Sequence, residues 1–327
     1  MYHDLRKRAL AVRSDPTMGK SGTILIAGKT GRLARDLVEA ADRWGINITA
    51  LGRPDLDVQD RDSIARVLAA QTPCAVINAA GQVIMDDAER DPARAFAINC
   101  DGAGYLAAAA ASAGIPFVHL SSDYVFDGAK GTPYREDDAC APLSVYGRSK
   151  AAGEEAVLDA HADAVVVRTS WVYGPHGTNF LTSMLRLAEM QDVVRVVGDQ
   201  SGTPTAGPEL ADALLEMIRQ VLAQPGEPRS GIYHLAGAGE TTWFGFAEAI
   251  FSGWARRGHR VPAVQAISAA DWRSLARRPS DSRLDCSKIA GTFGITLADW
   301  TESLERCLDD LAERHRHPRN AAQARGR

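Results

Sequence analysis

Two polar segments of this chain carry residue types that can protonate a carbonyl oxygen. Tyr146 and Lys150 stand four residues apart in a segment with helical character, so both side chains project from one face about a turn apart. An ammonium about 4 Å from a developing phenolate is worth roughly 4 kcal/mol at an effective dielectric constant near 20, enough to bring a tyrosine pKa from about 10 toward neutrality. The pair therefore predicts a general acid, Tyr146, assisted by Lys150.

The second segment, Ser121-Ser122-Asp123-Tyr124, follows an apolar run at 115–120 that is typical of a buried parallel strand. Open α/β sheets bind their ligands at the carboxyl ends of such strands. A Tyr-x-x-x-Lys spacing also arises on solvated helix faces, and serine pairs also serve in turns and caps. The strand end and the glycine loop described next favour a catalytic site over these alternatives.

A glycine-rich turn follows the first predicted strand and precedes a helix, which is the context that a dinucleotide-binding loop requires. Gly28 allows the tight turn, and Gly31 lets backbone N–H groups approach a pyrophosphate at the helix N-terminus. Ala34 stands at the third position of the pattern, where close packing of helix on strand also tolerates alanine. We predict a nicotinamide dinucleotide cofactor.

The residues after the second predicted strand bear on which cofactor binds. An acidic residue there holds the ribose of NADH, whereas an arginine accommodates the 2′-phosphate of NADPH. The chain has Arg53 at this place, which favours NADPH, while Asp55 and Asp57 lie near enough to leave NADH open. The alternative for Arg53 is a solvated loop charge.

Composition excludes several classes of partner. The chain has 327 residues and a formal net charge of −4, so it has no global attraction to nucleic acid or to an anionic membrane. Its longest apolar candidate, at 103–113, is too short to span a bilayer. The five cysteines are scattered, form no CxxC pair and are odd in number, which fits a reducing cytoplasm.

Short apolar runs alternate with amphipathic stretches, a pattern that predicts an α/β, doubly wound parallel (Rossmann) sheet with a smaller C-terminal substrate-binding lobe. We expect strands at 23–27, 47–51, 75–78, 116–121 and 164–169, and helices that start near residues 32, 60, 92 and 144. Further helices are expected at 179–190, 208–222, 244–254 and 299–313.

These elements suggest a division of the chain. We expect an NAD(P)-binding Rossmann domain at 22–170 and, at 171–313, a region that is mainly substrate lobe with some segments returning to the Rossmann domain. Residues 1–21 are expected to form a disordered extension, with Met18 as an alternative start, and 314–327 a disordered basic tail.

Longer motifs give the chain a resemblance to a known family over about residues 23–311. It resembles the extended short-chain dehydrogenase/reductases, and among them most closely the dTDP-4-dehydrorhamnose reductases. The glycine loop and Tyr-x-x-x-Lys occur across the superfamily, whereas RTSWVYG at 168–174 and DQSGTPT at 199–205 are more diagnostic. The other matching segments are 28–33, 77–80, SSDYVFDG at 121–128, Asn179-Phe180, GIYHL at 231–235 and RPSDSRL at 278–284.

The resemblance implies NADPH-dependent reduction of the C4 ketone of dTDP-4-dehydro-β-L-rhamnose to dTDP-L-rhamnose, the last step of that nucleotide sugar's synthesis. Tyr146 would protonate the C4 oxygen, Lys150 would also hold the nicotinamide ribose, and Ser122 would hydrogen-bond the carbonyl. The cofactor residues would be Gly28, Thr30, Gly31, Arg32, Leu33, Arg53, Asp57, Val58, Ala79, Ala80, Tyr146 and Lys150. The substrate residues would be Asp123, Tyr124, Trp171, Asn179, Gln200 and Thr205. A less favoured alternative for Trp171 is a place in the core, whereas Asn179 could equally be the cap of the helix that follows it.

One segment departs from the family pattern and keeps two alternatives open. Gly81, Gln82 and Val83 replace a common aromatic and threonine, and Asp87 stands where a lysine is usual. Another nucleotide-deoxysugar 4-ketoreductase or epimerase of the same fold therefore remains an alternative, as does a non-catalytic regulatory subunit like the methionine adenosyltransferase beta subunit. Relatives also suggest a homodimer and Mg²⁺ at a dimer contact, but no carboxylate cluster identifies such a site, so no metal ligand is predicted.

Overall fold

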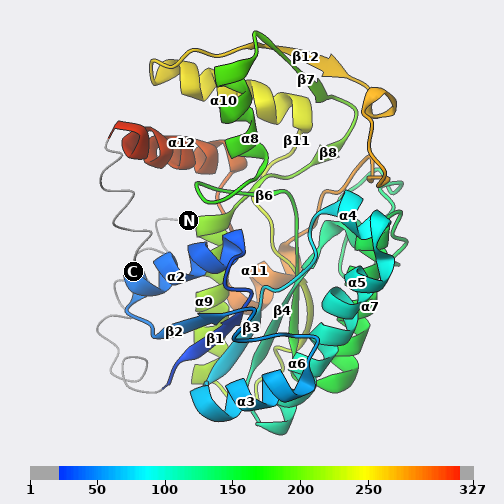
Figure 1. Cartoon of the computed structure of the whole chain (residues 1–327), viewed down its shortest axis with the longest axis vertical. Helices are drawn as coiled ribbons and strands as arrows, with labels where there is room; N and C mark the ends of the chain where they lie inside the picture. The colour runs from blue at the N-terminus through cyan, green and yellow to red at the C-terminus, as the bar shows by residue number, and fades with distance from the viewer. Residues whose placement is uncertain (1–21, 317–327) are drawn as a thin grey trace.

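The computed structural model describes residues 22–316, and at its centre lies a parallel sheet of six strands (Figure 1). The strand order is β10-β5-β4-β3-β1-β2, and every neighbouring pair is parallel. The strands are β1 (Ile24–Ala27), β2 (Ile48–Leu51), β3 (Ala75–Asn78), β4 (Phe117–Ser122), β5 (Val165–Thr169) and β10 (Gly231–His234). The first five lie within one residue of the predicted strands, whereas β10 was not among them.

Helices cover both faces of this sheet, as a doubly wound fold requires. Because successive strand residues point to opposite faces, Ile26 joins a core under one helical layer and Leu25 a core under the other. One layer consists of α2 (Arg32–Trp44), α9 (Gly207–Ala223) and α11 (Ser287–Phe293), and the other of α3 (Arg61–Gln71), α6 (Gly102–Ser112) and α7 (Val145–Ala160). The predicted fold class is confirmed. No helix within residues 22–316 combines the length and apolarity that a membrane span needs.

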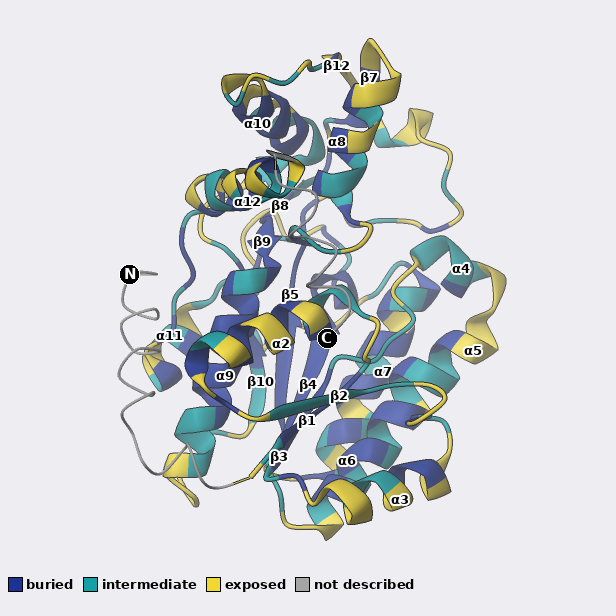
Figure 2. Cartoon of the chain, turned by 60° about the vertical axis from the view of Figure 1, so that its left-hand side comes forward, coloured by how far each residue is buried: buried dark blue, intermediate teal, exposed yellow. Residues whose placement is uncertain are grey.

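A smaller lobe lies beyond the sheet and has a core of its own (Figure 2). Its helices are α8 (Phe180–Met190), α10 (Trp243–Arg256) and α12 (Trp300–Arg316). Its strand pairs are β7 (Val193–Val197) with β12 (Ala263–Ile267), β6 (Val172–Tyr173) with β9 (Thr205–Ala206), and β8 (Ser201–Gly202) with β11 (Thr241–Thr242). Between these elements the chain returns to the sheet through α9, β10 and α11.

The helix starts follow from capping side chains that are visible in the sequence. Asp60 caps α3 by accepting from the Asp62 N–H (2.9 Å), and Ser144 caps α7 by accepting from the Gly147 N–H (3.1 Å). The helix expected from residue 92 is divided, however. It consists of α5 (Pro92–Phe96), a π-helical turn η1 (Ala97–Asp101) and α6, and a further short helix, α4 (Met85–Arg90), precedes it.

The two predicted terminal segments fall mostly outside the described residues. The extension at 1–21 and residues 317–327 lie wholly outside them, but α12 continues through 314–316. Arg314 donates to Asp310 one turn earlier (3.0 Å), which supports the last turn of the helix. Residues 314–316 are therefore helical, and the rest of the predicted tail lies outside the described residues.

A buried ion pair fastens α7 to the centre of the sheet. Arg168 of β5 donates to both carboxylate oxygens of Glu154, from Nε at 2.9 Å and from Nη2 at 2.6 Å, and both residues are at most 3% exposed. Ser121 of β4 donates to the same carboxylate, and His234 of β10 lies 3.4 Å from Arg168 Nη1. The network joins three adjacent strands to the helix that carries Tyr146 and Lys150.

Replacing Glu154 by alanine should destabilise the protein strongly, because Arg168 would remain buried without its counter-charge. We expect a loss of about 3–5 kcal/mol in the free energy of unfolding, measured by urea denaturation. Asp87→Ala, which removes an exposed pair with Arg90 (2.8 Å), is the control and should cost about 1 kcal/mol or less. Equal losses in the two variants would contradict the role given to the buried pair.

Candidate active site

The glycine loop joins β1 to α2 and approaches the end of β3 very closely. Gly28 has a φ of +116°, and a Cβ there would lie 2.9 Å from backbone atoms of Ala79 and Ala80. Gly31 caps α2 and donates its N–H to the Gly28 carbonyl (2.8 Å). This backbone geometry forms a cradle at a helix N-terminus that fits the pyrophosphate of a dinucleotide. Thr30 belongs to the same turn, and Leu33 lies in the first turn of α2.

Arg32 extends from the first turn of α2 toward both parts of the molecule. Its Nη1 donates to the Thr178 carbonyl of the lobe (3.3 Å), and its charge interacts with Asp36 and with Tyr146. Burial lowers the pKa of Arg32. The loop thus contributes a cation beside the predicted general acid.

At the end of β2 the Arg53 guanidinium is available to a ligand, because the nearby Asp55 carboxylate already pairs with Lys29. Asp55 accepts from Lys29 (3.2 Å), whereas exposed Arg53 has no hydrogen bond or ion pair with any residue of 22–316. Asp57 accepts from the Gln59 backbone N–H (3.0 Å) in a local turn. These contacts leave Arg53 as the group at this edge that can take a 2′-phosphate. The adjacent Val58 is buried against Gly102.

The predicted catalytic residues come together where β4 meets the first turns of α7. Gly147 makes this approach possible, because a Cβ there would overlap the carbonyl oxygen of Tyr124. Ser122 donates to Asp123 Oδ1 (3.0 Å) and interacts with the Tyr146 hydroxyl through a side-chain hydrogen bond. Tyr146 and Tyr124 meet edge to face, with ring centroids 6.1 Å apart.

The expected lowering of the Tyr146 pKa is wrong for this arrangement. Burial raises the pKa of Tyr146 to about 12, and the Ser122 hydrogen bond and the Arg32 charge oppose this only in part. Lys150 instead donates to the Leu120 carbonyl, and its Nζ lies 3.2 Å from His119 Nε2. Burial also lowers the pKa of Lys150 to about 8. The spacing of four residues places the pair on one face, but the Lys150 side chain contacts β4 rather than the phenol.

Asp123 and Trp171 lie on the lobe side of Ser122 and are joined by Ser282. Trp171 Nε1 donates to Ser282 Oγ (3.1 Å), and the Ser282 side chain hydrogen-bonds Asp123. Trp171 has a φ of +43° and stacks on Trp243 with ring centroids 3.5 Å apart. Asp123 Oδ2 is buried without a partner among the described residues, and burial raises the Asp123 pKa to about 7.

Three other predicted substrate residues are buried in the lobe. Asn179 caps α8 by accepting from the Thr182 N–H (3.2 Å), and it donates to the Gly174 carbonyl (2.9 Å). This is the role of helix cap that the sequence offered as an alternative to substrate binding. Thr205 is fully buried and accepts from the Gly237 N–H (3.2 Å). Gln200 is 8% exposed. The structure shows supporting roles for Asn179 and Thr205, and substrate contact by these residues stays a prediction.

The segment that departs from the family pattern is held by Asn99. Its side chain accepts from the Gln82 N–H (2.8 Å) and donates to the Gln82 carbonyl (3.1 Å), and a Cβ on Gly81 would lie 3.2 Å from Asn99 Oδ1. Val83 is 56% exposed. A small residue at position 81 therefore fits the close approach of Asn99.

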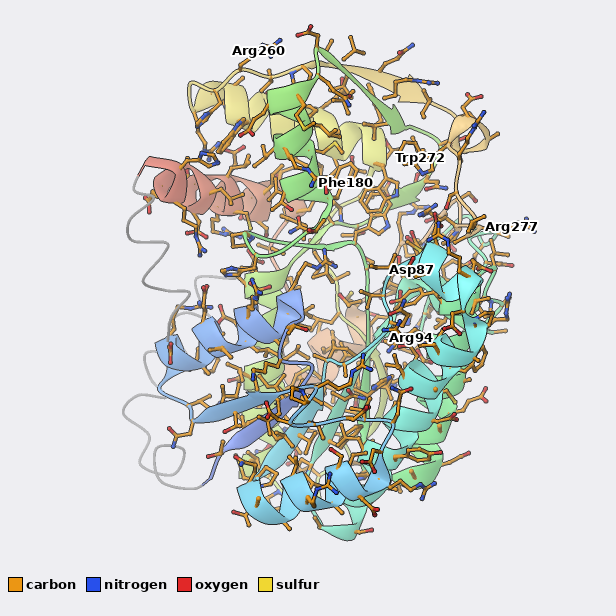
Figure 3. The ribbon with its side chains drawn as sticks, viewed as in Figure 1. Asp87, Arg94, Phe180, Arg260, Trp272 and Arg277 are labelled. Carbon is orange, nitrogen blue, oxygen red and sulfur yellow. The ribbon has the colours of Figure 1, made fainter. Side chains whose placement is uncertain are left out.

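Asp87 belongs to a contact zone between α4 and a segment that comes from the lobe. Figure 3 places Asp87 below Trp272 and Arg277, and neighbouring Asp86 accepts from Ser274 Oγ (2.7 Å) and from the Ala276 N–H (3.2 Å). Asp87 itself pairs with Arg90. This zone connects the two parts of the molecule at the side of the site.

Sequence reasoning missed three polar residues that surround the predicted catalytic residues. His119 lies inside a strand predicted as apolar, Asn78 ends the predicted strand at 75–78, and Ser282 lies within the motif at 278–284. A histidine within a buried strand was the available signal for His119. Within residues 22–316, no three His, Cys, Asp or Glu side chains are grouped so as to hold a metal ion.

Comparison with known proteins agrees with this geometry. A family model described as RmlD substrate binding domain matches residues 22–313. The dTDP-4-dehydrorhamnose reductase of Sinorhizobium fredii is 44% identical over 285 residues, which cover 87% of this chain and 96% of that relative. The Escherichia coli reductase is 36% identical over 294 residues, covering 88% and 97%. The chain belongs to the dTDP-4-dehydrorhamnose reductase family.

Solved structures agree with this family membership. The dTDP-4-dehydrorhamnose reductase of Bacillus anthracis in complex with NADP superposes with a TM-score of 0.82 at 31% identity, covering 89% of this chain and 99% of that one. The UDP-glucose 4-epimerase of Thermus thermophilus, in complex with NAD, has a TM-score of 0.72 at 19% identity, covering 88% and 98%. At that identity the epimerase shows the shared fold alone.

The raised pKa of Asp123 predicts a pH-dependent stability. Its folded pKa of about 7 exceeds the unfolded value near 3.9, so the stabilising contribution is complete below about pH 4 and is lost as the pH rises through about 7. The amide of Asp123→Asn does not ionise, so the variant does not lose this contribution to stability as the pH rises. The unfolding free energy of the variant, relative to the unsubstituted protein, should rise by about 2–3 kcal/mol between pH 5 and pH 8 in urea denaturation.

The matched control is Asp163→Asn at an exposed position. Its relative stability should hardly change between the two pH values. A flat pH dependence for Asp123→Asn as well would show that the Asp123 carboxyl is ionised normally in the folded protein.

Proposed function

We propose that this protein reduces the C4 ketone of dTDP-4-dehydro-β-L-rhamnose with NADPH and yields dTDP-L-rhamnose, the last step of dTDP-rhamnose synthesis. The observation that carries the proposal is the assembly of Ser122, Tyr146 and Lys150 beside the glycine loop in a chain of this reductase family. The complete set speaks against a non-catalytic subunit. The low identity to the epimerases favours a reductase over an epimerase.

The dinucleotide would lie across the carboxyl ends of the strands. Support comes from the backbone cradle at Gly28 and Gly31 and from the exposed guanidinium of Arg53, which has no ion pair with any residue of 22–316. NADPH supplies the hydride for C4 when it is bound. The residues proposed to hold it are Gly28, Thr30, Gly31, Arg32, Leu33, Arg53, Asp57, Val58, Ala79, Ala80, Tyr146 and Lys150.

Tyr146 is the proton donor in this proposal. Because burial raises the pKa of Tyr146 to about 12, the phenol stays protonated at neutral pH and is available to the C4 oxygen as negative charge develops there. The Arg32 guanidinium favours the phenolate that results. Lys150 holds the nicotinamide ribose and, when it turns from β4, also supports the phenolate.

In this proposal Ser122 orients the substrate carbonyl, and Asp123 controls the direction of the Ser122 O–H group. An ionised Asp123 accepts a hydrogen bond from the Ser122 hydroxyl, as in the present contact of 3.0 Å. A protonated Asp123, which its pKa of about 7 allows near neutrality, can donate to Ser122 Oγ instead. Ser122 then directs its own proton at the C4 oxygen.

The lobe supplies the sugar pocket in this proposal. Asp123, Tyr124 and Trp171 line it near C4, while Asn179, Gln200 and Thr205 lie toward the nucleotide end. Residues 22–170 thus bind chiefly the dinucleotide, and 171–313 chiefly the substrate. We extend the proposal to a homodimer in the cytoplasm, where the five free thiols of the described residues are compatible with a reducing compartment.

Tyr146→Phe tests the proton donor. Turnover of dTDP-4-dehydrorhamnose should fall by about 10²–10⁴ because a positioned general acid is lost, while the dissociation constant for NADPH should stay nearly unchanged. Loss of nicotinamide absorbance measures the first quantity and fluorescence titration the second. Tyr105→Phe, at a tyrosine that packs against Arg61, is the control and should keep full activity. An unchanged rate in Tyr146→Phe would refute the mechanism.

Arg53→Ala tests the cofactor preference. Loss of one charge-assisted hydrogen bond should raise the Michaelis constant for NADPH about 10-fold and leave that for NADH nearly unchanged. Arg66→Ala, at an arginine whose side chain is 71% exposed, should alter neither constant. A clear preference of the unsubstituted enzyme for NADH would overturn the assignment.

A further inference from the structure

His119 occupies the centre of the sheet directly behind Lys150. It lies on β4 between β3 and β5, is 0% exposed, and has both ring nitrogens within hydrogen-bond distance of a side chain. Nδ1 lies 3.1 Å from Asn78 Nδ2, and Nε2 lies 3.2 Å from Lys150 Nζ. The proposed mechanism does not use this histidine.

The amide of Asn78 determines which nitrogen of His119 carries the proton. The Ala80 backbone N–H donates to Asn78 Oδ1 (3.1 Å), so the Asn78 Nδ2 group is the one that faces His119. An amide NH₂ can only donate, so Nδ1 must accept. In a neutral imidazole the proton then sits on Nε2, the nitrogen that faces Lys150.

This tautomer restricts the state of the amine. An Nε2–H group opposite an ammonium would set a donor against a donor, whereas a neutral amine has a lone pair to accept it. The amine can still donate to the Leu120 carbonyl. We propose that His119, oriented by Asn78, is a positioning residue that holds Lys150 as a neutral amine while Lys150 lies against β4.

The surrounding ionisable groups are consistent with this assignment. Glu154, on the same helix, favours the ammonium, but its carboxylate is bound by Arg168 and Ser121. Asp123 in η2 (Asp123–Val125) interacts with Ser122, Ser282 and the two nearby tyrosines. Cys100 in η1 interacts with Asp101 and Glu155. Burial of Lys150 acts in the same direction as the His119 contact.

The inference rests on the proposed function and adds one step to it, the protonation of Lys150 when the cofactor binds. To hold the ribose and support a phenolate, Lys150 must turn from β4 as an ammonium. Its lone pair then takes one proton from solvent and forms an N–H bond, and the buffer supplies that proton. Binding of NADPH should therefore be accompanied by proton uptake.

Calorimetric titration of the nucleotide-free protein with NADPH, in buffers of different ionisation enthalpy at pH 8.5, measures this uptake. We expect roughly half a proton or more per site. In His119→Gln the amide can present its oxygen to an ammonium, so uptake should fall clearly below that of the unsubstituted protein, and burial of Lys150 accounts for what remains. In Asn78→Asp the second carboxylate oxygen can accept from Nδ1–H, which moves the proton away from Nε2, and uptake should fall likewise.

His161→Gln is the matched control, because His161 is also buried but contacts the Ile115 carbonyl (3.0 Å) outside the site. Its uptake should equal that of the unsubstituted protein. Uptake near zero in the unsubstituted protein, or unchanged uptake in His119→Gln, would overturn the inference.

The tautomer can be read without any nucleotide. Nitrogen-15 NMR of labelled histidine, assigned by comparison with His119→Gln, should show His119 protonated at Nε2 and not at Nδ1. The reverse tautomer would overturn the inference by itself. Failure of NADPH to bind would instead refute the proposed cofactor while the NMR result still decides the state of His119.

Discussion

The close packing of α7 on the end of β4 is the constraint on which the site depends. Tyr146, Lys150 and Glu154 follow at intervals of four along one stripe of α7, so all three face the sheet. The buried Arg168–Glu154 pair holds the far end of the stripe, and Gly147 lets the near end touch the backbone of Tyr124. Because these contacts determine the height and rotation of the helix, they also decide that Tyr146 meets Ser122.

Burial dominates the electrostatics of this region. The phenol of Tyr146 and the amine of Lys150 are both removed from water, which disfavours their charged forms and shifts their pKa values toward neutral species. Asp123 follows the same rule, with a pKa of about 7. Neutral groups in the site can donate or accept protons near neutral pH. The negative charge that develops on a reacting oxygen is then the largest change in charge within the site.

The lobe is connected to this centre through a few polar contacts. Trp171, Ser282 and Asp123 form a line from the lobe to Ser122, and Arg32 reaches from the glycine loop to the Thr178 carbonyl. Asp86 binds the segment around Ser274 on another side. Movement of the lobe would therefore change the contacts of Asp123 and Arg32, both of which interact with Tyr146.

The sequence by itself determined the local features: the first five strands, the helix starts at Asp60 and Ser144, the glycine loop and the residues of the catalytic motif. These depend on periodicity, capping and backbone freedom, which act over a few residues. Only the tertiary structure decided the partners of those residues. β10 returns from far along the chain, Asn179 is used as a cap, and His119 rather than Tyr146 faces the Lys150 amine. Burial and contacts between distant segments set these outcomes, and neither is encoded in the spacing of neighbouring residues.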